Sequence, residues 1–497
     1  MATTIRSPRH NVADREWRIS LGDRELGVGH RYVSLNPTTE QPLAEVPDCT
    51  TDDVDIAVRQ AEDAQRSWSR MAVRARARHL RSFADALREH REELAVLDSL
   101  DGGFPVSAMR LDVDAAVEYV EIMCDLALSL GGRTIPATAE NLHYTLREPY
   151  GVVARIVPYN HPLFFAASKV AAPLIAGNSV VLKAPEQTPL SALRIAEIAR
   201  EVLPVGILSV LSGQGPASGR ALVRHPAVRR IAFIGSEGTG RSILRDAAET
   251  GVKDVTLELG GKNAMIVLPD ANPERAAAGA VAGMNFTATM GQSCGSTSRL
   301  LVHEAIAEDV LRHVDALVGR IRIGDPLAEE TQMGPLVSRQ HYQRVLDAID
   351  SAHRDGAEVR IGGGRPSHIG DTGYFVGPTV LTQVRPDSAV ARTEIFGPVL
   401  SVMTFTDVDE AVQIANDVDY GLTAAVWTEN LQMAHTLAAR VQAGYVWVNC
   451  SARHFWGVPF GGVKSSGIGR EDSVEELVSF SQIKAVNVHL SSPELAK

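Results

Sequence analysis

Residues 151–162 read GVVARIVPYNHP, and the change of pattern that begins there decides the fold. Val152 to Val157 form a short run rich in β-branched side chains, which is typical of a strand. Similar runs follow at 179–182, 207–211, 231–234 and 255–259, separated by stretches with helical periodicity. Strands that alternate with helices predict a doubly wound parallel sheet, with helices on both faces. Such sheets bind ligands beyond the carboxyl ends of their strands.

The rest of the chain divides around this block. From about 52 to 130, apolar residues recur near the helical period, which predicts amphipathic helices. Residues 132–150 and 480–490 are strand-like and alternate polar with apolar side chains, so we predict arms that pair with another subunit. From about 263 to 470, strands and helices alternate again. This pattern predicts a second α/β domain, with strands at 264–268, 299–302, 380–381, 399–405, 424–427 and 444–448.

The composition is that of an ordinary globular protein. The 497 residues are 45% hydrophobic and 22% charged, with a net charge of −11. This charge argues against a nucleic-acid or anionic-membrane partner. Residues 1–20 carry charges throughout and lack an apolar segment typical of a signal peptide. The four cysteines are widely scattered, so we expect no disulfide framework, no zinc site and a reducing, cytoplasmic setting.

Lysine is rare in this chain. Only seven of its 49 cationic residues are lysines. Because lysine presents a compact point charge and arginine a planar fork, a retained lysine in a glycine- or proline-rich motif suggests a site that needs an ammonium group. We make this prediction for Lys169, Lys183, Lys262 and Lys464, and expect chance retention on the surface for Lys253, Lys484 and Lys497.

Cys294 lies in GQSCGSTSR (291–299), a small, polar, glycine-rich stretch. A cysteine that packs in a core normally has apolar neighbours, so this sequence favours an accessible thiol, with core packing as the alternative. Glu258 lies 36 positions upstream (294 − 258), where an apolar segment breaks into a glycine turn. The chain therefore offers a nucleophile and a possible general base.

Two glycine loops are candidates for a dinucleotide site. Gly213 to Gly219 is one residue longer than the usual fingerprint, whereas Gly235 to Gly240 follows a strand and opens a helical stretch. We favour the second loop for a pyrophosphate, because helix N-termini bind anions, and leave adenine or structural packing for the first.

Three other motifs are ambiguous by themselves. Asn160 lies between two prolines and suits either an oxyanion donor or an Asx-turn. Lys183 and Glu186 follow the second strand and suit either ribose hydroxyls or a surface ion pair. A tight turn carries the Glu394 carboxylate and the Phe396 ring.

Taken together, these motifs resemble those of the aldehyde dehydrogenase superfamily, from Asn36 to about Val488. The resemblance rests on seven ordered stretches: 158–162, 183–189, 233–240, 258–262, 291–294, 394–398 and 459–467. It implies an NAD-binding domain (1–130 and 151–262), a catalytic domain (263–473) and an oligomerisation arm (131–150 and 474–497). It also implies oxidation of an aldehyde to its acid, with NAD or NADP as the acceptor, in a homodimer or homotetramer.

The resemblance assigns roles to individual residues. Cys294 would attack the aldehyde, Glu258 would act as general base and Asn160 would hold the oxyanion. Lys169 and Glu471 match positions linked to proton relay, with an ion pair between domains as the alternative. Cofactor contacts are implied for Ile156, Val157, Pro158, Tyr159, Lys183, Glu186, Gly215, Phe233, Gly235, Ser236, Leu259, Gly260, Glu394 and Phe396. Candidate substrate contacts are His161, Phe164, Ser293, Gly295, His454, Trp456 and Phe460; no metal is expected.

The choice between NAD and NADP remains, as do two rival functions. Glu186 would repel the 2′-phosphate of NADP, which favours NAD, although Lys183 could offset the repulsion. Family members often carry Trp and Phe where this chain has Tyr159 and His161, and Glu237 stands where a small hydroxyl residue is common.

The rival functions are a coenzyme-A-acylating semialdehyde dehydrogenase, which characteristically lacks the glutamate at position 258, and a non-catalytic binding protein. The presence of Glu258 argues against the first rival, and the presence of Cys294, Glu258 and Asn160 together argues against the second.

Overall fold

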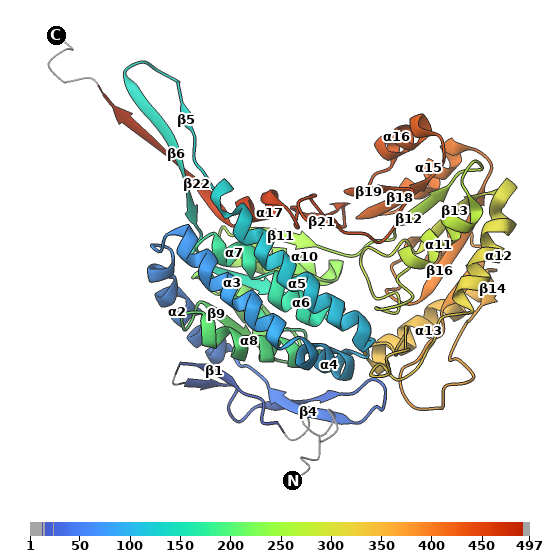
Figure 1. The fold of residues 1–497 in the computed structure, drawn as a ribbon, viewed down its shortest axis with the longest axis horizontal. Coiled ribbons are helices and arrows are strands. Elements are labelled where there is room, and N and C mark those ends of the chain that lie inside the picture. Colours follow the sequence, from blue (N-terminus) through green and yellow to red (C-terminus); the bar gives the residue numbers. More distant parts are fainter. Residues whose placement is uncertain (1–11, 13–14, 23, 491–497) are drawn as a thin grey trace.

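The computed structural model describes residues 12, 15–22 and 24–490. Two sheets dominate the molecule (Figure 1). The first has six strands in the order β21-β11-β10-β7-β8-β9, parallel except for β21. Its strands are β7 (Val152–Ile156), β8 (Ser179–Lys183), β9 (Leu208–Leu211), β10 (Val228–Ile234), β11 (Asp254–Glu258) and β21 (Gly467–Ile468). The predicted doubly wound sheet is confirmed.

The strand order identifies where this sheet should bind a ligand. The chain runs outward from β7 through β8 to β9, and then returns to the other side of β7 with β10 and β11. A crevice forms where the order reverses, beyond the carboxyl ends of the strands. Ile156 and Phe233 pair at the ends of β7 and β10, so they mark this switch point.

The second sheet has seven strands in the order β14-β15-β16-β13-β12-β18-β19. Its parallel strands are nearly fully buried, as expected when helices cover both faces. Only β14, at one edge, is antiparallel within this sheet. The strands are β12 (Ala264–Val267), β13 (Arg299–His303), β14 (Glu358–Ile361), β15 (Thr379–Thr382), β16 (Val399–Phe405), β18 (Thr423–Trp427) and β19 (Tyr445–Val448).

Helices flank both sheets (Figure 1). The predicted helical region is four helices: α2 (Thr51–Trp68), α3 (Val73–Glu89), α4 (Arg91–Gly102) and α5 (Val106–Leu126). The first sheet also carries α6 (Pro162–Ser168), α7 (Ala171–Ile175), α8 (Leu190–Val202), α9 (Pro216–Arg224) and α10 (Glu237–Thr250). The remaining helices are α11 (Pro273–Gly283), α12 (Ala307–Val318), α13 (Arg339–Arg354), α14 (Ala389–Arg392), α15 (Val408–Asn416), α16 (Leu431–Arg440) and α17 (Val474–Ser479).

A three-stranded antiparallel sheet projects from the body of the molecule (Figure 1). It contains β5 (Thr134–Ile135), β6 (Asn141–Pro149) and β22 (Ser481–His489), so the two predicted arm segments pair with each other. Leu142 lies opposite Val488, and Tyr144 opposite Val486. Directly opposite residues share a face, so these four side chains form an apolar arm face, and none of them belongs to a hydrophobic core of the described residues.

The sequence missed several short strands. At the N-terminal end these form two hairpins: β1 (Ile19–Leu21) with β2 (Arg24–Leu26), and β3 (Arg31–Leu35) with β4 (Pro42–Pro47). It also missed β14, β21 and the pair formed by β17 (Tyr420–Gly421) and β20 (Val463–Lys464). Of these, β17, β20 and β21 have two residues each, which is too few for a periodic signal.

The predicted domain boundaries stay a prediction. β21 falls within the predicted range 263–473, yet it pairs with β11 of the first sheet. Residues 1–11, 13–14 and 23 of the first predicted range, and 491–497 of the arm, lie outside the described residues. Within the described part of the chain, no helix is long and apolar enough to cross a membrane.

Candidate active site

A cavity of about 230 Å³ lies where the first and second sheets face each other. All four predicted catalytic residues and all seven predicted substrate residues line it. The strand ends of β10 and β11 contribute Ile234 and Glu258, and the loop before β13 contributes Cys294. The sequence missed five other lining residues, of which only Ile234 lies within a motif quoted above: Asp112, Ala115, Phe165, Ile234 and Asp472.

Asn263 holds the loop that carries Cys294. Its Nδ2 donates to the Cys294 carbonyl at 2.7 Å and to the Ser296 carbonyl at 2.9 Å, while its Oδ1 accepts from the Thr423 N–H at 3.0 Å. Gly291 has φ +71°, and a Cβ there would lie 2.3 Å from the Gly397 carbonyl oxygen. The loop is therefore fixed by an amide on one side and a close backbone approach on the other.

Cys294 and Glu258 are neighbours that act on each other's protonation. Burial raises the pKa of the Cys294 thiol well above its ordinary value, and the charges of Glu258 and Glu394 add to the rise. Burial also raises the pKa of Glu258, with a contribution from Glu471. By geometry, neither Glu258 oxygen has a hydrogen-bond partner among the described residues. A buried carboxyl with a raised pKa beside a thiol is suited to accept a proton.

Asn160 lies on the loop between β7 and α6, with 3% of its surface exposed. Its Oδ1 is buried and has no hydrogen-bond partner among the described residues. Nearby, the Leu163 N–H at the start of α6 donates to Asp98 Oδ2 at 2.9 Å, which fixes this turn from outside. The side-chain amide therefore faces the cavity uncommitted to the protein.

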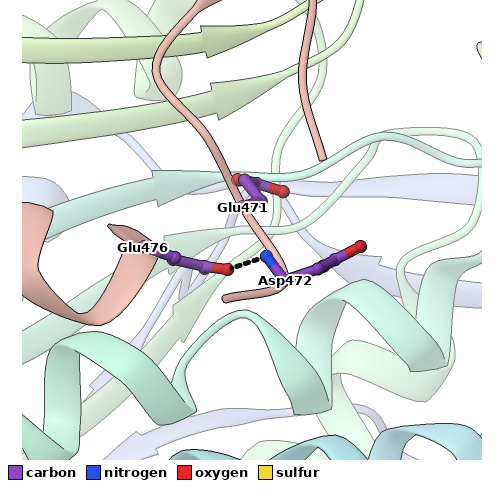
Figure 2. Close-up of side chains that lie close together, drawn as sticks. All are labelled: Glu471, Asp472 and Glu476. Carbon is purple, nitrogen blue, oxygen red and sulfur yellow. Dashed lines mark hydrogen bonds between the residues drawn. The ribbon is translucent and has the colours of Figure 1, made fainter. Parts of the chain in front are cut away.

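Lys169 forms a buried ion cluster at another wall of the cavity. Its Nζ lies 2.7 Å from Asp472 Oδ1, 3.1 Å from Glu471 Oε2 and 3.6 Å from Glu476 Oε2. Figure 2 shows these three carboxylates, with the Asp472 N–H donating to Glu476. Arg155 Nη2 binds Glu471 at 2.8 Å. The oxygens that could hold a metal ion thus already contact two cations, which suits an ion cluster more than a metal centre.

A second cavity, of about 360 Å³, lies beside the carboxyl ends of β7 and β8. Of the predicted cofactor residues, Ile156, Lys183 and Gly215 line it. Both glycine loops contribute, the first through Gly215 and Gly219 and the second through Thr239. The sequence missed its other lining residues, which lie on α9 and α10: Arg220, Val223, Ser242, Ile243, Arg245 and Asp246.

The remaining predicted cofactor residues line neither of these two cavities, and only two of them line a third, smaller one. Glu394 and Phe396 line a small pocket beside Ser293, and Glu394 accepts from the Gly261 N–H at 3.0 Å. Burial raises the pKa of Glu394 to about 7. Gly235 is fixed by a close approach, because a Cβ there would lie 2.4 Å from the Phe233 ring. Other predicted residues line none of these three cavities: Val157, Pro158, Tyr159, Glu186, Phe233, Gly235, Ser236, Leu259 and Gly260.

The rare lysines differ in their environments. Lys169, Lys183 and Lys262 are buried, and burial lowers the pKa of Lys183 to about 8 and that of Lys262 to about 7. Lys464 donates to two backbone carbonyls, at 2.8 and 3.1 Å. The expectation for Lys253 was wrong: its Nζ donates to the Val223 and His225 carbonyls, and burial lowers its pKa to about 8. The surrounding sequence gives no sign of those distant acceptors.

Comparison with known proteins identifies the family. The sequence profile of the aldehyde dehydrogenase family matches residues 27–486, nearly the whole chain. The chain belongs to the aldehyde dehydrogenase family. It is therefore an oxidoreductase that acts on aldehydes, and the predicted fold and resemblance are confirmed.

Individual relatives agree across almost their full lengths. The chain is 42% identical to the aldehyde dehydrogenase tropH of Talaromyces stipitatus, covering 96% of this chain and 92% of that one. It is 39% identical to a peroxisomal aminoaldehyde dehydrogenase of Pisum sativum, covering 99% and 97%. A solved NAD+ complex of an aldehyde dehydrogenase from Bacillus cereus superposes with a TM-score of 0.93, at 38% identity over 97% of this chain and 98% of that one.

Proposed function

We propose that this aldehyde dehydrogenase converts an aldehyde to its carboxylic acid through a thiohemiacetal and a thioester on Cys294. The observation that supports this most is the meeting of Cys294, Glu258 and Asn160 in one cavity, where by geometry the Glu258 oxygens and Asn160 Oδ1 have no hydrogen-bond partner among the described residues. Each group has a distinct task in acyl-transfer chemistry.

The residues divide the reaction between them. Glu258 takes the thiol proton, directly or through a water, and the Cys294 sulfur bonds to the aldehyde carbon. The Asn160 amide and the Cys294 backbone N–H donate to the oxyanion, and loss of one such donor typically costs about 3 kcal/mol. A bound NAD would supply the acceptor for the hydride that leaves this carbon. Glu258, once it has released this first proton to solvent, removes a proton from the water that hydrolyses the thioester, and this second proton returns to the Cys294 sulfur as the acid leaves.

The residues present fit a dinucleotide. The second cavity lies at the switch point of a doubly wound sheet, beside the N-terminus of α10, where Ser236 caps the helix. Gly215 and Gly219 leave open space there, since an added Cβ would meet no atom within 4 Å. Lys183 and Glu186 would meet the adenosine ribose, and Glu394 the nicotinamide ribose.

We infer that NAD is preferred over NADP. The Glu186 carboxylate accepts from the Gly215 N–H at 2.6 Å and so remains beside the second cavity, where it would repel a 2′-phosphate. Arg220 and Arg245 line the same cavity and, with Lys183, weaken that repulsion. NADP is therefore the weaker of the two acceptors rather than an excluded one.

The cavity walls favour a medium-sized aromatic or aliphatic aldehyde. Phe164, Phe165, Trp456 and Phe460 supply apolar surface. The aminoaldehyde in the name of the pea relative implies an ammonium group. Asp112 could face such a group, but it is already paired with His161 at 2.7 Å, so we do not favour an aminoaldehyde here.

We also infer that the protein forms a homo-oligomer. The projecting arm sheet offers an apolar face suited to a homodimer or homotetramer. A cytoplasmic location stays a prediction, because relatives named in the comparisons include peroxisomal and chloroplastic forms.

The test measures NADH and acid formation from an aldehyde panel, with and without coenzyme A. We expect Cys294→Ala to lower kcat by at least about 10⁴-fold, because it lacks the nucleophile. Glu258→Gln should lower kcat by about 10²–10⁴-fold, since it cannot act as a base.

The outcomes separate the alternatives. Turnover that requires coenzyme A and yields a thioester product would favour the acylating branch. Absence of turnover with every aldehyde would favour a non-catalytic protein, and full activity in Cys294→Ala would refute the covalent mechanism.

A further inference from the structure

His161 and Asp112 form a pair in the wall of the main cavity. His161 Nδ1 lies 2.7 Å from Asp112 Oδ2, and both side chains line the cavity. The two residues come from the start of α6 and from α5, 49 positions apart. Within the described part of the chain, the other ring nitrogen, Nε2, has no hydrogen-bond partner. The pair therefore presents one uncommitted imidazole nitrogen.

The imidazole is held in one orientation. Its ring meets that of Phe165 at 90°, with centroids 5.9 Å apart, and that of Phe164 at 73° and 6.4 Å. The hydrogen bond to Asp112 fixes the remaining rotation. A hydrogen-bonding group that is fixed in this way, within a wall of aromatic rings, can select substrates.

The pair keeps Nε2 available in both protonation states. Burial opposes the charge of His161, but Asp112 outweighs it, so the pKa of the imidazole is raised above its ordinary value. In the charged state Nε2–H is a donor; in the neutral state, with Nδ1–H donated to Asp112, Nε2 is an acceptor. A hydroxyl group can satisfy both states, whereas an ammonium suits only the acceptor and a carboxylate only the donor.

We propose that His161, positioned by Asp112, is a specificity residue that binds a hydroxyl group on an aromatic aldehyde. This proposal rests on the aldehyde oxidation proposed above. Phe164 and Trp456 supply a surface for the ring, with their own planes 19° apart and centroids separated by 6.0 Å. The hydroxyl would replace the water that otherwise solvates Nε2, so an analogue without it leaves that nitrogen unpaired.

The experiment compares meta- and para-hydroxybenzaldehyde with the corresponding methylbenzaldehydes, in which a methyl group replaces the hydroxyl. Acid formation is followed by chromatography with NAD present. For at least one isomer, we expect the KM of the hydroxy compound to be about ten-fold below that of its methyl counterpart. In His161→Phe this ratio should fall to within about two-fold.

Three variants serve as controls. Asp112→Asn still offers an acceptor to Nδ1 and should keep most of the preference, whereas Asp112→Leu should lose it. His454→Phe removes the other imidazole of the cavity by the same substitution and should keep the preference. Circular dichroism and the thermal midpoint show that each variant is folded.

The outcomes distinguish this inference from the proposed function. If hydroxy and methyl compounds are oxidised with equal KM, or if the preference survives in His161→Phe, the hydroxyl site is refuted while aldehyde oxidation stands. Loss of the preference in His454→Phe alone would also refute it. If no compound is oxidised by the native protein, the proposed function itself fails.

Discussion

At the scale of single residues, Lys169 shows how geometry separates two roles. The sequence left open a proton relay or an ion pair. The structure places Nζ within 3.6 Å of three carboxylates and over the Tyr119 ring at 4.6 Å. Burial disfavours its charge, but the carboxylates raise its pKa well above the ordinary value. We therefore propose that this ammonium is a permanent counter-charge.

We predict that Lys169→Met destabilises the protein by about 3–5 kcal/mol, because it leaves buried carboxylates with one cation fewer. Chemical denaturation measures the free energy of unfolding. The exposed Arg59→Met, which removes a surface pair with Asp55, should leave the free energy of unfolding nearly unchanged. A Lys169→Met protein of native stability that has lost its activity would instead support the relay.

At the scale of secondary-structure elements, buried carboxylates on α4 hold the starts of other helices. Asp98 accepts from the Leu163 N–H in α6, and Asp101 Oδ2 accepts from the Leu190 N–H in α8 at 3.0 Å. Ser34 donates to the other Asp101 oxygen. These contacts link the helical region to β3 and to the first sheet, and they place Asn160 and His161 at the cavity.

Asp101 makes stability depend on pH. Burial raises its pKa from 3.8 to about 7. Between these two pH values the folded state therefore binds more protons than the unfolded state. The stabilisation that protonated Asp101 contributes to the free energy of unfolding is full below about pH 4 and is lost as the pH rises through 7. This rise in the pKa of Asp101 changes the free energy of unfolding by on the order of 4 kcal/mol across that pH range.

We predict that Asp101→Asn removes this dependence. Between about pH 4.5 and 7.5, the thermal midpoint of the native protein should fall relative to that of the variant. The exposed Asp63→Asn serves as the control and should follow the native protein. Parallel curves for the native protein and Asp101→Asn would contradict the prediction.

At the scale of the whole molecule, the active-site cavity needs both sheets, whereas the arm contributes none of its lining. The arm instead presents an apolar face and an edge strand, β22, with no neighbour on its outer side among the described residues. Exposed edges and apolar faces of this kind are usually covered by a partner. Assembly and chemistry thus lie in different parts of the fold.

We predict that the double variant Leu142→Asp with Val488→Asp is a monomer. The two residues lie opposite each other, so the variant places two negative charges on the arm face. Size-exclusion chromatography with light scattering measures the mass. Val252→Asp, at a position 98% exposed and outside the arm, should leave the mass unchanged. A monomeric native protein, or an unchanged mass in the double variant, would contradict the assembly proposed above.

The sequence by itself determined the two alternating blocks, the arm segments and the motifs that carry Cys294, Glu258 and Asn160. These are local properties: a buried parallel strand needs a continuous apolar run, and a reactive loop needs small neighbours. Only the tertiary structure decided the pairing of His161 with Asp112, the support of Cys294 by Asn263, and the contact of Lys169 with Asp472, 303 positions away. Periodicity predicts which face of a helix is buried, but the partner across that face depends on how distant elements pack.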